Sequence, residues 1–273
     1  MGLAERSPSP FVAYRVGVKA NMFDLSKHVA LVTGGNGGLG LAMAKGLIKA
    51  GASVAIWGRN EMKNADAVTA LRALGGDTEA FVCEVTDPTQ VADAFAATLE
   101  RFGKVDSCFA NAGGSGPTGM LHQLPQEQWA AVLDLNLNSV VNTYRVVIAH
   151  LLERKAGGKL IATSSVAANL GMPLHAGYST TKAALLGLTR SLAIELGRAN
   201  IQVNALLPGY IATEMSLDTS QAFQDAAKRR SAAGEVGRLE DMEGIAVYLA
   251  SPESRFMTGQ GIVIDGGQSI FPG

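Results

Sequence analysis

The sequence predicts one α/β domain, a doubly wound, seven-stranded parallel sheet with helices on both faces. Short β-rich runs alternate with helix-length apolar stretches along nearly the whole chain, which is typical of a parallel sheet with crossover helices. Most of these runs are near-continuous Val, Ile, Leu and Ala, as expected for strands covered on both faces. The 273 residues, 47% hydrophobic and 17% charged, suit a single hydrophobic core and exclude a disordered chain.

The elements follow one another in a regular order. The strand-like runs are HVALVTG (28–34), SVAIWG (53–58), EAFVCEV (79–85), VDSCFAN (105–111), KLIATSS (159–165), IQVNALLPG (201–209) and GIVIDGG (261–267). Helical stretches are expected between them at 39–50, 61–74, 89–102, 126–155, 178–198 and 240–250. No internal repeat or linker divides the chain, so we expect residues 23–273 to form one domain.

Two segments depart from this rhythm. Residues 1–22 mix Pro, Ser and Arg with a short apolar piece broken by Arg15, a poor fit to a secretory signal, and are expected to be an N-terminal extension. Residues from about 210 to 237 carry scattered Met, Leu and Phe without firm capping signals. A long irregular insertion beyond the carboxyl end of a strand favours a substrate lid, and an ordinary pair of surface helices is the alternative.

Composition excludes several classes of function. The net charge is −1 and no long basic run occurs, so neither nucleic acid nor an anionic membrane is expected as a partner. No run of 18 apolar residues predicts a spanning helix. Cys83 and Cys108 lie inside strand-like runs and lack the Cys-x-x-Cys spacing of redox or zinc sites. We therefore expect buried thiols, no metal site, and a reducing, cytoplasmic location.

A glycine-rich stretch, VTGGNGGLG at 32–40, directly follows the first strand-like run and opens the first helix. Glycines allow the tight turn and the close approach of a pyrophosphate, which the N–H groups at the start of the helix then bind. The string fits G-x-G-x-x-G through Gly35, Gly37 and Gly40. It also fits T-G-x-x-x-G-x-G through Thr33, Gly34, Gly38 and Gly40. Both registers indicate dinucleotide binding on a Rossmann fold.

The second register, taken with YSTTK at 178–182, resembles the short-chain dehydrogenase/reductase family, in its single-domain, 3-oxoacyl-carrier-protein-reductase-like form. The resemblance extends from about Phe23 to Gly267. It includes NAG at 111–113, Asn136, SS at 164–165, PGYIAT at 208–213 and TGQGIVIDGG at 258–267. It implies hydride transfer between a nicotinamide cofactor and a carbonyl or secondary alcohol.

The resemblance assigns the catalytic group to Asn136, Ser165, Tyr178 and Lys182. Tyr178 would be the general acid and base. Because a phenol has a pKa of about 10, we expect the Lys182 ammonium, four residues on and on the same helical face, to favour the phenolate. Ser165 would bind the substrate oxygen, with Ser164 as its rival. Asn136 would order a water near Lys182.

Cofactor-binding roles are implied by the same resemblance for residues at the ends of several strands. They are Gly34, Asn36, Gly38, Leu39, Gly40, Gly58, Arg59, Asn60, Glu84, Val85, Asn111, Ala112, Gly113, Tyr178, Lys182, Pro208, Gly209, Ile211 and Thr213. Ala110 replaces the first Asn of the usual Asn-Asn-Ala-Gly. Glu84 stands where an Asp usually meets the adenine, and its longer side chain could still reach.

The end of the second strand-like run favours NADP(H) over NAD(H). Gly58 occupies the place of the acidic residue that would bind the ribose 2′-OH of NAD, and Arg59 follows at once. A planar guanidinium suits a 2′-phosphate. We expect Asp at Gly58 to shift the preference towards NAD. NAD(H) stays open as the alternative because the glycine loop brings no second basic group.

The substrate is a small carbonyl or alcohol compound whose identity the sequence leaves open among a 3-oxoacyl thioester, a sugar or polyol, and a small ketone. The resemblance places Ser115, Ser165, Met172, His175 and Met215 at the substrate. Two other classes of function are alternatives: an inactive nucleotide-binding or scaffolding protein, and an isomerase or dehydratase that keeps its cofactor bound.

Assembly is expected to be a homotetramer, with a dimer as the second choice. The stretch LNLNSVVNTYRVVIAHLL, at 135–152, carries apolar residues on more than one helical face, which exceeds what one side of a sheet needs. Members of the family pair this helix, and the one that begins near Tyr178, across a two-fold axis.

Overall fold

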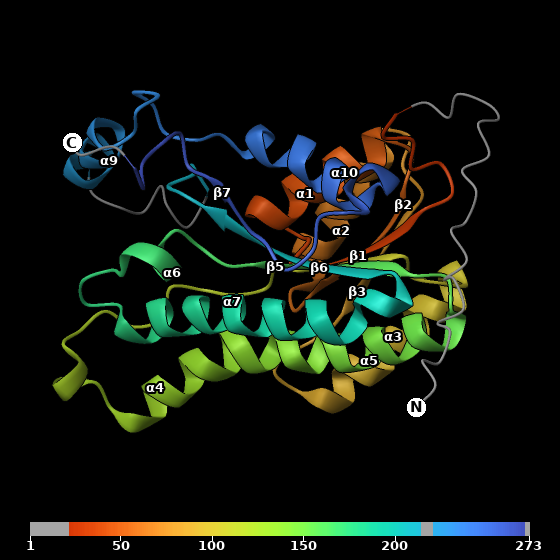
Figure 1. Cartoon of the computed structure of the whole chain (residues 1–273), viewed down its shortest axis with the longest axis horizontal. Helices are drawn as coiled ribbons and strands as arrows, with labels where there is room; N and C mark the ends of the chain where they lie inside the picture. Colours follow the sequence, from red (N-terminus) through yellow and green to blue (C-terminus); the bar gives the residue numbers. More distant parts are fainter. Residues whose placement is uncertain (1–21, 214–220, 271–273) are drawn as a thin grey trace, which may run out of the picture.

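The computed structural model describes residues 22–213 and 221–270. Seven parallel strands form one sheet in the order β3-β2-β1-β4-β5-β6-β7 (Figure 1). They are β1 (Val29–Thr33), β2 (Ser53–Gly58), β3 (Thr78–Val82), β4 (Ser107–Ala110), β5 (Gly158–Thr163), β6 (Ile201–Pro208) and β7 (Gly261–Ile264). The strand order reverses between β1 and β4, where doubly wound sheets bind their ligands. The predicted fold class is confirmed.

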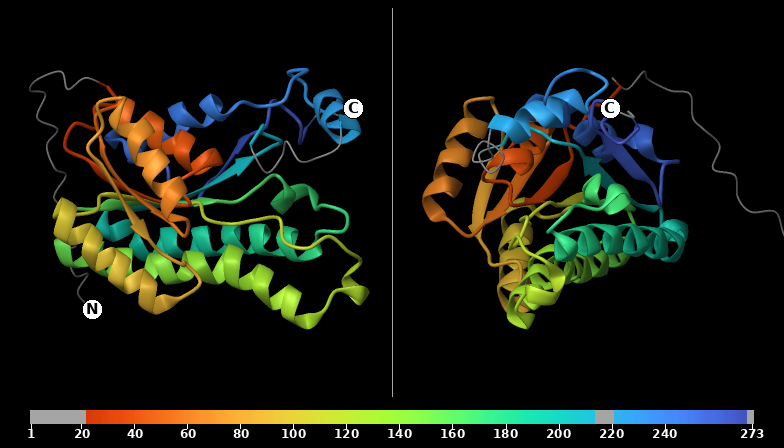
Figure 2. Two further views of the ribbon diagram at one scale, coloured as in Figure 1. Left: turned by 180° about the vertical axis from the view of Figure 1, so that it is seen from behind. Right: turned by 90° about the vertical axis from the view of Figure 1, so that its left-hand side faces the viewer.

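Helices cover both faces of the sheet. The two figures agree in placing one group above the sheet and the other below it (Figures 1 and 2). The first group is α1 (Gly38–Lys49), α2 (Glu61–Arg72) and α10 (Glu243–Ala250), and the second is α3 (Pro88–Phe102), α5 (Ser139–Arg154) and α7 (Ala176–Leu196). Shorter elements are α4 (Gln126–Leu133), α6 (Ala167–Leu170), α9 (Gln221–Arg229) and the 3₁₀ turns Leu121–Gln123, Gly197–Ala199, Leu239–Met242 and Pro252–Ser254.

Each face of the sheet has its own hydrophobic core. Side chains alternate across a strand, so Val32 of β1 packs with Met43 and Ile56 on one face, while neighbouring Leu31 packs with Trp57 and other residues on the opposite face. All five residues of β1 are buried. This two-sided burial explains why the strand sequences are continuous apolar runs.

The helix expected over 126–155 is interrupted. The five residues Asp134–Asn138 form a π turn between α4 and α5, in which the Ser139 N–H donates to the Asp134 carbonyl. A π turn inserts one residue into the helical ladder and is frequent at functional sites. Here it contains Asn136, one of the expected catalytic residues. Apolar periodicity continues through the turn, so the sequence pattern gave no sign of it.

The insertion at 210–237 is closed at its base. Ile211 and Gly237 form an isolated parallel bridge, in which the Ala212 N–H donates to the Gly237 carbonyl at 2.9 Å. Within the described part of this insertion lies α9, so the stretch is not wholly irregular. Residues 1–21, 214–220 and 271–273, which include most of the expected extension, lie outside the described residues. Among the described helices, none has the length and apolar character needed to cross a bilayer.

Candidate active site

A cleft of about 620 Å³ opens at the carboxyl ends of the strands, beside the point where the strand order reverses. It brings together most of the residues expected from the sequence: Gly34, Asn36, Gly38, Leu39, Gly58, Arg59, Asn60, Val85, Asn111, Ala112, Gly113, Ser115, Ser165, Tyr178, Lys182, Pro208, Gly209 and Thr213. The expected residues Gly40, Glu84, Asn136, Met172, His175 and Ile211 are not among those lining it. Met215 lies outside the described residues.

The glycine turn has the backbone geometry expected for the motif T-G-x-x-x-G-x-G. Gly34 and Gly38 have φ angles of +62° and +49°, in the left-handed region that favours glycine. A Cβ atom added at Gly40 would lie 2.2 Å from the Gly34 carbonyl oxygen, so only glycine allows α1 to begin this close to β1. The N-terminus of α1 thereby faces the cleft with backbone N–H groups that suit a pyrophosphate.

Asn111 holds three strand ends together beneath the cleft. Its Nδ2 donates to the carbonyls of Thr33 and Gly34 at 3.2 and 3.3 Å, and its Oδ1 accepts from the Thr163 hydroxyl at 3.2 Å. The Thr33 hydroxyl accepts from the N–H groups of Asn111 and Ala112 at 3.0 and 3.1 Å. These bonds join the carboxyl ends of β1, β4 and β5, so Asn111 fixes the shape of the cleft wall.

Tyr178 and Lys182 lie one turn apart on α7 and both line the cleft. The Lys182 Nζ lies 5.5 Å from the centre of the Tyr178 ring and donates to the Thr163 carbonyl at 2.8 Å. Burial lowers the pKa of Lys182 to about 8. Burial raises the pKa of Tyr178, although a hydrogen bond with Ser165 opposes the rise.

Removal of the phenol from water therefore raises the pKa of Tyr178 on balance, and the effect of the Lys182 ammonium on the phenolate stays a prediction. A phenol with a raised pKa stays protonated at neutral pH. It can donate a proton to a carbonyl oxygen placed beside it. Ser165, which lies just after β5, is hydrogen-bonded to Tyr178. The Ser164 hydroxyl instead donates to the Lys182 carbonyl at 2.7 Å.

Asn136 connects the π turn to the loop after β4. Its Nδ2 donates to the Gly114 carbonyl at 2.9 Å, and its Oδ1 accepts from the Gly114 N–H at 3.0 Å. A Cβ atom added at Gly113 would lie 2.7 Å from the Asn136 Oδ1 and 3.5 Å from the Lys182 Nζ. Asn136 thus lies close to Lys182, as expected, with its side chain bonded to the loop.

At the far end of the cleft, Gly58 lies against the ends of two side chains. A Cβ atom there would lie 2.2 Å from the Asn36 Nδ2 and 2.5 Å from the Asn64 Oδ1. The Asn36 Nδ2 donates to the Asn64 Oδ1 at 2.7 Å, and the Asn64 Nδ2 donates to the Gly58 carbonyl at 2.9 Å. This amide pair fills the space that an acidic side chain would need. An Asp at Gly58 could therefore meet a ribose only after the ends of these two side chains shift, and its effect on cofactor preference stays a prediction.

Two basic side chains line this end of the cleft. Arg59 directly follows β2, and Lys63 lies in the first turn of α2, whose N-cap Asn60 accepts from the Lys63 N–H at 2.9 Å. Lys63 was missed from the sequence. The signal that could have found it is the spacing of four residues from Arg59 across a helix start. Glu84 pairs with Arg59 at 3.1 Å.

The substrate side of the cleft is lined by Gly114, Ser115 and Leu135, of which only Ser115 was expected. His175 instead contacts the neighbouring loop, with Nε2 3.2 Å from the Thr118 hydroxyl. The Leu174 carbonyl accepts from the Gly119 N–H at 2.9 Å. The two loops that flank this side are thereby joined outside the cleft.

Comparisons with known proteins identify the family of this chain. The family model described as "Enoyl-(Acyl carrier protein) reductase" matches residues 34–269. Gluconate 5-dehydrogenase of Gluconobacter oxydans (strain 621H) is 36% identical over 252 residues, covering 92% of this chain and 98% of the relative. The 3-oxoacyl-[acyl-carrier-protein] reductase of Chlamydia pneumoniae is 33% identical over 237 residues, covering 87% and 95%.

Among solved structures, a 7α-hydroxysteroid dehydrogenase in complex with NADH and 7-oxo glycochenodeoxycholic acid has a TM-score of 0.87. It is 26% identical and covers 92% of this chain and 98% of its own. This chain belongs to the short-chain dehydrogenase/reductase family. It is an NAD(P)-dependent oxidoreductase that interconverts carbonyl and alcohol groups.

Proposed function

We propose that this protein catalyses the reversible reduction of a carbonyl compound to a secondary alcohol, with NADP(H) preferred over NAD(H). The observation that carries the proposal is the placement of Tyr178, Lys182 and Ser165 on the wall of the cleft that the glycine turn closes. When bound, the nicotinamide supplies or accepts the hydride. Every remaining task falls to residues of this chain.

Binding of the dinucleotide fits the cleft. The close approach of α1 to β1 at Gly40 leaves the backbone of the glycine turn open to a pyrophosphate. Lys182, held by the Thr163 carbonyl, would bind the nicotinamide ribose. Arg59 and Lys63 provide two cationic groups for a 2′-phosphate, and no carboxylate occupies position 58 to bind a ribose 2′-OH.

The proton follows a short route. Ser165 donates a hydrogen bond to the substrate oxygen and orients it, while Tyr178 donates its proton to the same oxygen. In the direction of alcohol oxidation, Tyr178 accepts that proton. Burial raises the pKa of the phenol, which keeps Tyr178 in its protonated, proton-donating form at neutral pH.

The segment from about 210 to 237 is proposed as the substrate lid on the single domain of residues 23–273. Its base at Ile211 and Gly237 lies next to Pro208, Gly209 and Thr213, which belong to the cleft wall or border it. The segment that contains α9 therefore begins at the cleft wall, which supports a role as a lid. Met215 of the same segment would contact the substrate.

We further propose a cytoplasmic homotetramer. The side chain of Ile194 on α7 is 84% exposed and that of Leu152 on α5 is 44% exposed, an apolar surface suited to a second copy. Light scattering that gives four times the chain mass at micromolar concentration would support it, and a monomer would contradict it.

The test of the proposed reaction is turnover with defined substrates. We would assay a 3-oxoacyl thioester, gluconate with its 5-keto product, a steroid ketone and a small diketone, each with NADPH and NADH. The proposal expects a measurable kcat/KM for at least one carbonyl and a higher value with NADPH. Turnover with no carbonyl or alcohol, or a consistent preference for NADH, would contradict the respective part.

A further inference from the structure

An ion pair at the adenosine end of the cleft joins two strand ends. The Arg59 Nη1 donates to the Glu84 Oε2 at 3.1 Å. Arg59 follows β2 directly, and Glu84 lies two residues beyond β3. The Arg59 side chain is 69% exposed and lines the cleft, whereas the Glu84 side chain is 28% exposed and lies outside the lining.

Glu84 is held firmly in this position. Its Oε1 accepts from the Thr86 N–H at 3.1 Å, and its own N–H donates to the Gln90 Oε1 at 3.1 Å. Burial raises the pKa of Glu84, but the hydrogen bonds from Thr86 and Arg59 outweigh it and the pKa is lowered. At neutral pH a fixed negative charge therefore contacts Arg59. The hydrogen bonds that the structure shows for the Glu84 carboxylate are made with Thr86 and Arg59. The contact with adenine that the sequence suggests would be additional to them.

A bound 2′-phosphate needs the same guanidinium. An exposed ion pair contributes only about 0–1 kcal/mol, so a phosphate dianion can draw Arg59 away from Glu84. Binding of the dianion then loses the free energy of the ion pair, and the two anions also repel each other. A nucleotide without the 2′-phosphate makes no such demand on Arg59. The carboxylate therefore acts selectively on one of the two cofactors.

We propose that Glu84 limits the preference of this protein for 2′-phosphorylated nicotinamide nucleotides by competing for Arg59. The inference rests on the proposed use of NADP(H). It makes Glu84 a specificity-determining residue that touches no part of the reaction. The protein can still use NAD(H) because Glu84 partly neutralises Arg59, the principal side chain for binding the 2′-phosphate. Lys63, from the first turn of α2, also lines the cleft.

The test measures binding without turnover. Glu84→Gln removes the charge but keeps an amide oxygen that can accept from the Thr86 N–H. The probes are adenosine 2′,5′-bisphosphate and 5′-AMP, titrated calorimetrically at one pH and low ionic strength. We expect Glu84→Gln to lower the Kd of the bisphosphate about three- to fivefold and to leave that of 5′-AMP within about twofold. Unchanged or weakened bisphosphate binding would overturn the proposal.

Two controls separate competition from other effects. In an Arg59→Ala background, Glu84→Gln should change neither Kd by more than about twofold; a full gain there would show direct repulsion of the phosphate and overturn competition. Glu79→Gln breaks a similar ion pair on β3, with Arg72 at 3.2 Å and outside the cleft lining, and should leave both probes unaffected.

The proposed cofactor preference has its own readout in the same titrations. Wild type that binds 5′-AMP as tightly as the bisphosphate would contradict the preference for NADP(H). An Arg59-dependent gain in Glu84→Gln would still establish the competition. The two proposals therefore fail separately.

Discussion

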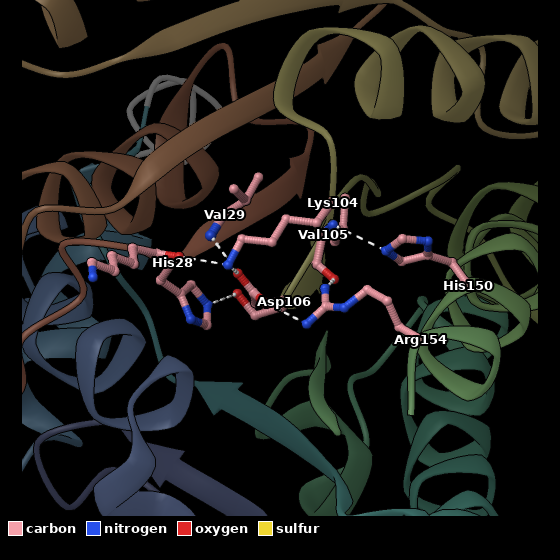
Figure 3. Close-up of polar contacts among 9 residues, drawn as sticks. His28, Val29, Lys104, Val105, Asp106, His150 and Arg154 are labelled. Atoms are coloured by element: carbon pink, nitrogen blue, oxygen red, sulfur yellow. Dashed lines mark hydrogen bonds and ion pairs between the residues drawn. The ribbon is translucent and has the colours of Figure 1, made fainter. Parts of the chain in front are cut away.

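The carboxyl edge and the amino edge of the sheet, where the parallel strands end and begin, both carry polar or charged groups, but these groups differ in how they are bonded. At the carboxyl edge, Tyr178, Ser165 and Arg59 present polar groups to an open cleft. At the amino edge, Asp106 accepts from the Val29 N–H at 2.9 Å, from Arg154 at 2.6 Å and from Lys104 at 2.9 Å (Figure 3). One set of groups is available to a ligand, and the other is occupied by its own neighbours.

Perturbed pKa values occur at both edges. Burial lowers the pKa of Lys182 at the carboxyl edge to about 8, and it lowers the pKa of His28 at the amino edge to about 4, although Asp106 opposes the second shift. His28 Nε2 lies 2.8 Å from the Ser107 hydroxyl, and His150 accepts from the Val105 N–H at 3.2 Å (Figure 3). A shifted pKa alone therefore does not mark an active site here. Access to a cleft separates catalytic from structural groups, and the two edges should respond oppositely to substitution.

The largest effect is expected at the carboxyl edge, for Tyr178→Phe. Loss of the phenolic proton should lower kcat/KM by about 10²–10⁴-fold while the nucleotide Kd and the melting temperature stay close to wild type. The matched control is Tyr144→Phe. The Tyr144 hydroxyl is buried without a hydrogen-bond partner in the described part of the chain, so its removal should not reduce turnover. Near-normal turnover in Tyr178→Phe would remove the catalytic role.

At the amino edge, Asp106→Asn should do the reverse. The Asp106 side chain is 14% exposed, and its substitution leaves Arg154 and Lys104 without a counter-charge. We expect a loss of about 3 kcal/mol in the free energy of unfolding, measured with urea, and an unchanged kcat/KM in the remaining folded protein. Asp77→Asn is the control. Its pair with Arg101 is solvent-exposed, so the loss should stay below about 1 kcal/mol. Equal losses in both variants would contradict the role of burial.

The amino edge should also impose acid sensitivity. His28 has a pKa of about 4 in the folded protein against 6.5 as its ordinary value. Between these values the unfolded chain binds a proton that the folded chain does not, so stability falls as pH falls from 6.5 to 4. The part due to His28 is at most about 3 kcal/mol.

His28→Gln should reduce the slope of the free energy of unfolding against pH between pH 4 and 6.5. Some slope will remain, because burial also lowers the pKa of His150. An unchanged slope in His28→Gln would show that His28 is not the group that titrates.

Much of the fold and of the site at the carboxyl edge could be predicted from the sequence, because parallel strands are buried on both faces and glycine motifs have steric causes. The seven strands, the cleft and the pair of Tyr178 and Lys182 follow from patterns local to a strand, a turn or one helical face. The position of Asn136 was expected, but the π turn around it was not. Apolar spacing does not register a single inserted residue.

The rest depends on contacts between distant segments. The Asn36–Asn64 pair spans 28 residues, and Arg59 meets Glu84 across 25. Asp106 bonds Val29 across 77 residues. Such bonds depend on side-chain directions at neighbouring strand ends, which periodicity does not contain. The raised pKa of Tyr178 could not be predicted for a related reason. The spacing from Lys182 is visible in the sequence, whereas the burial of the phenol is a property of the folded chain.

The smallest effect is expected at Gly58, which lines the cleft and is also packed against neighbouring side chains. A side chain there would require the ends of Asn36 and Asn64 to shift and would break the hydrogen bond between them. Gly58→Asp should therefore weaken 5′-AMP and adenosine 2′,5′-bisphosphate alike, by about tenfold, or about 1.4 kcal/mol. Calorimetry on the folded variant measures both constants. The control adds Asn36→Ala and Asn64→Ala, which open the space, and should recover 5′-AMP binding while the bisphosphate stays weak, because the new carboxylate repels the 2′-phosphate. Tighter 5′-AMP binding in Gly58→Asp alone would show that the pocket adapts to the side chain, and the steric account of this glycine would be abandoned.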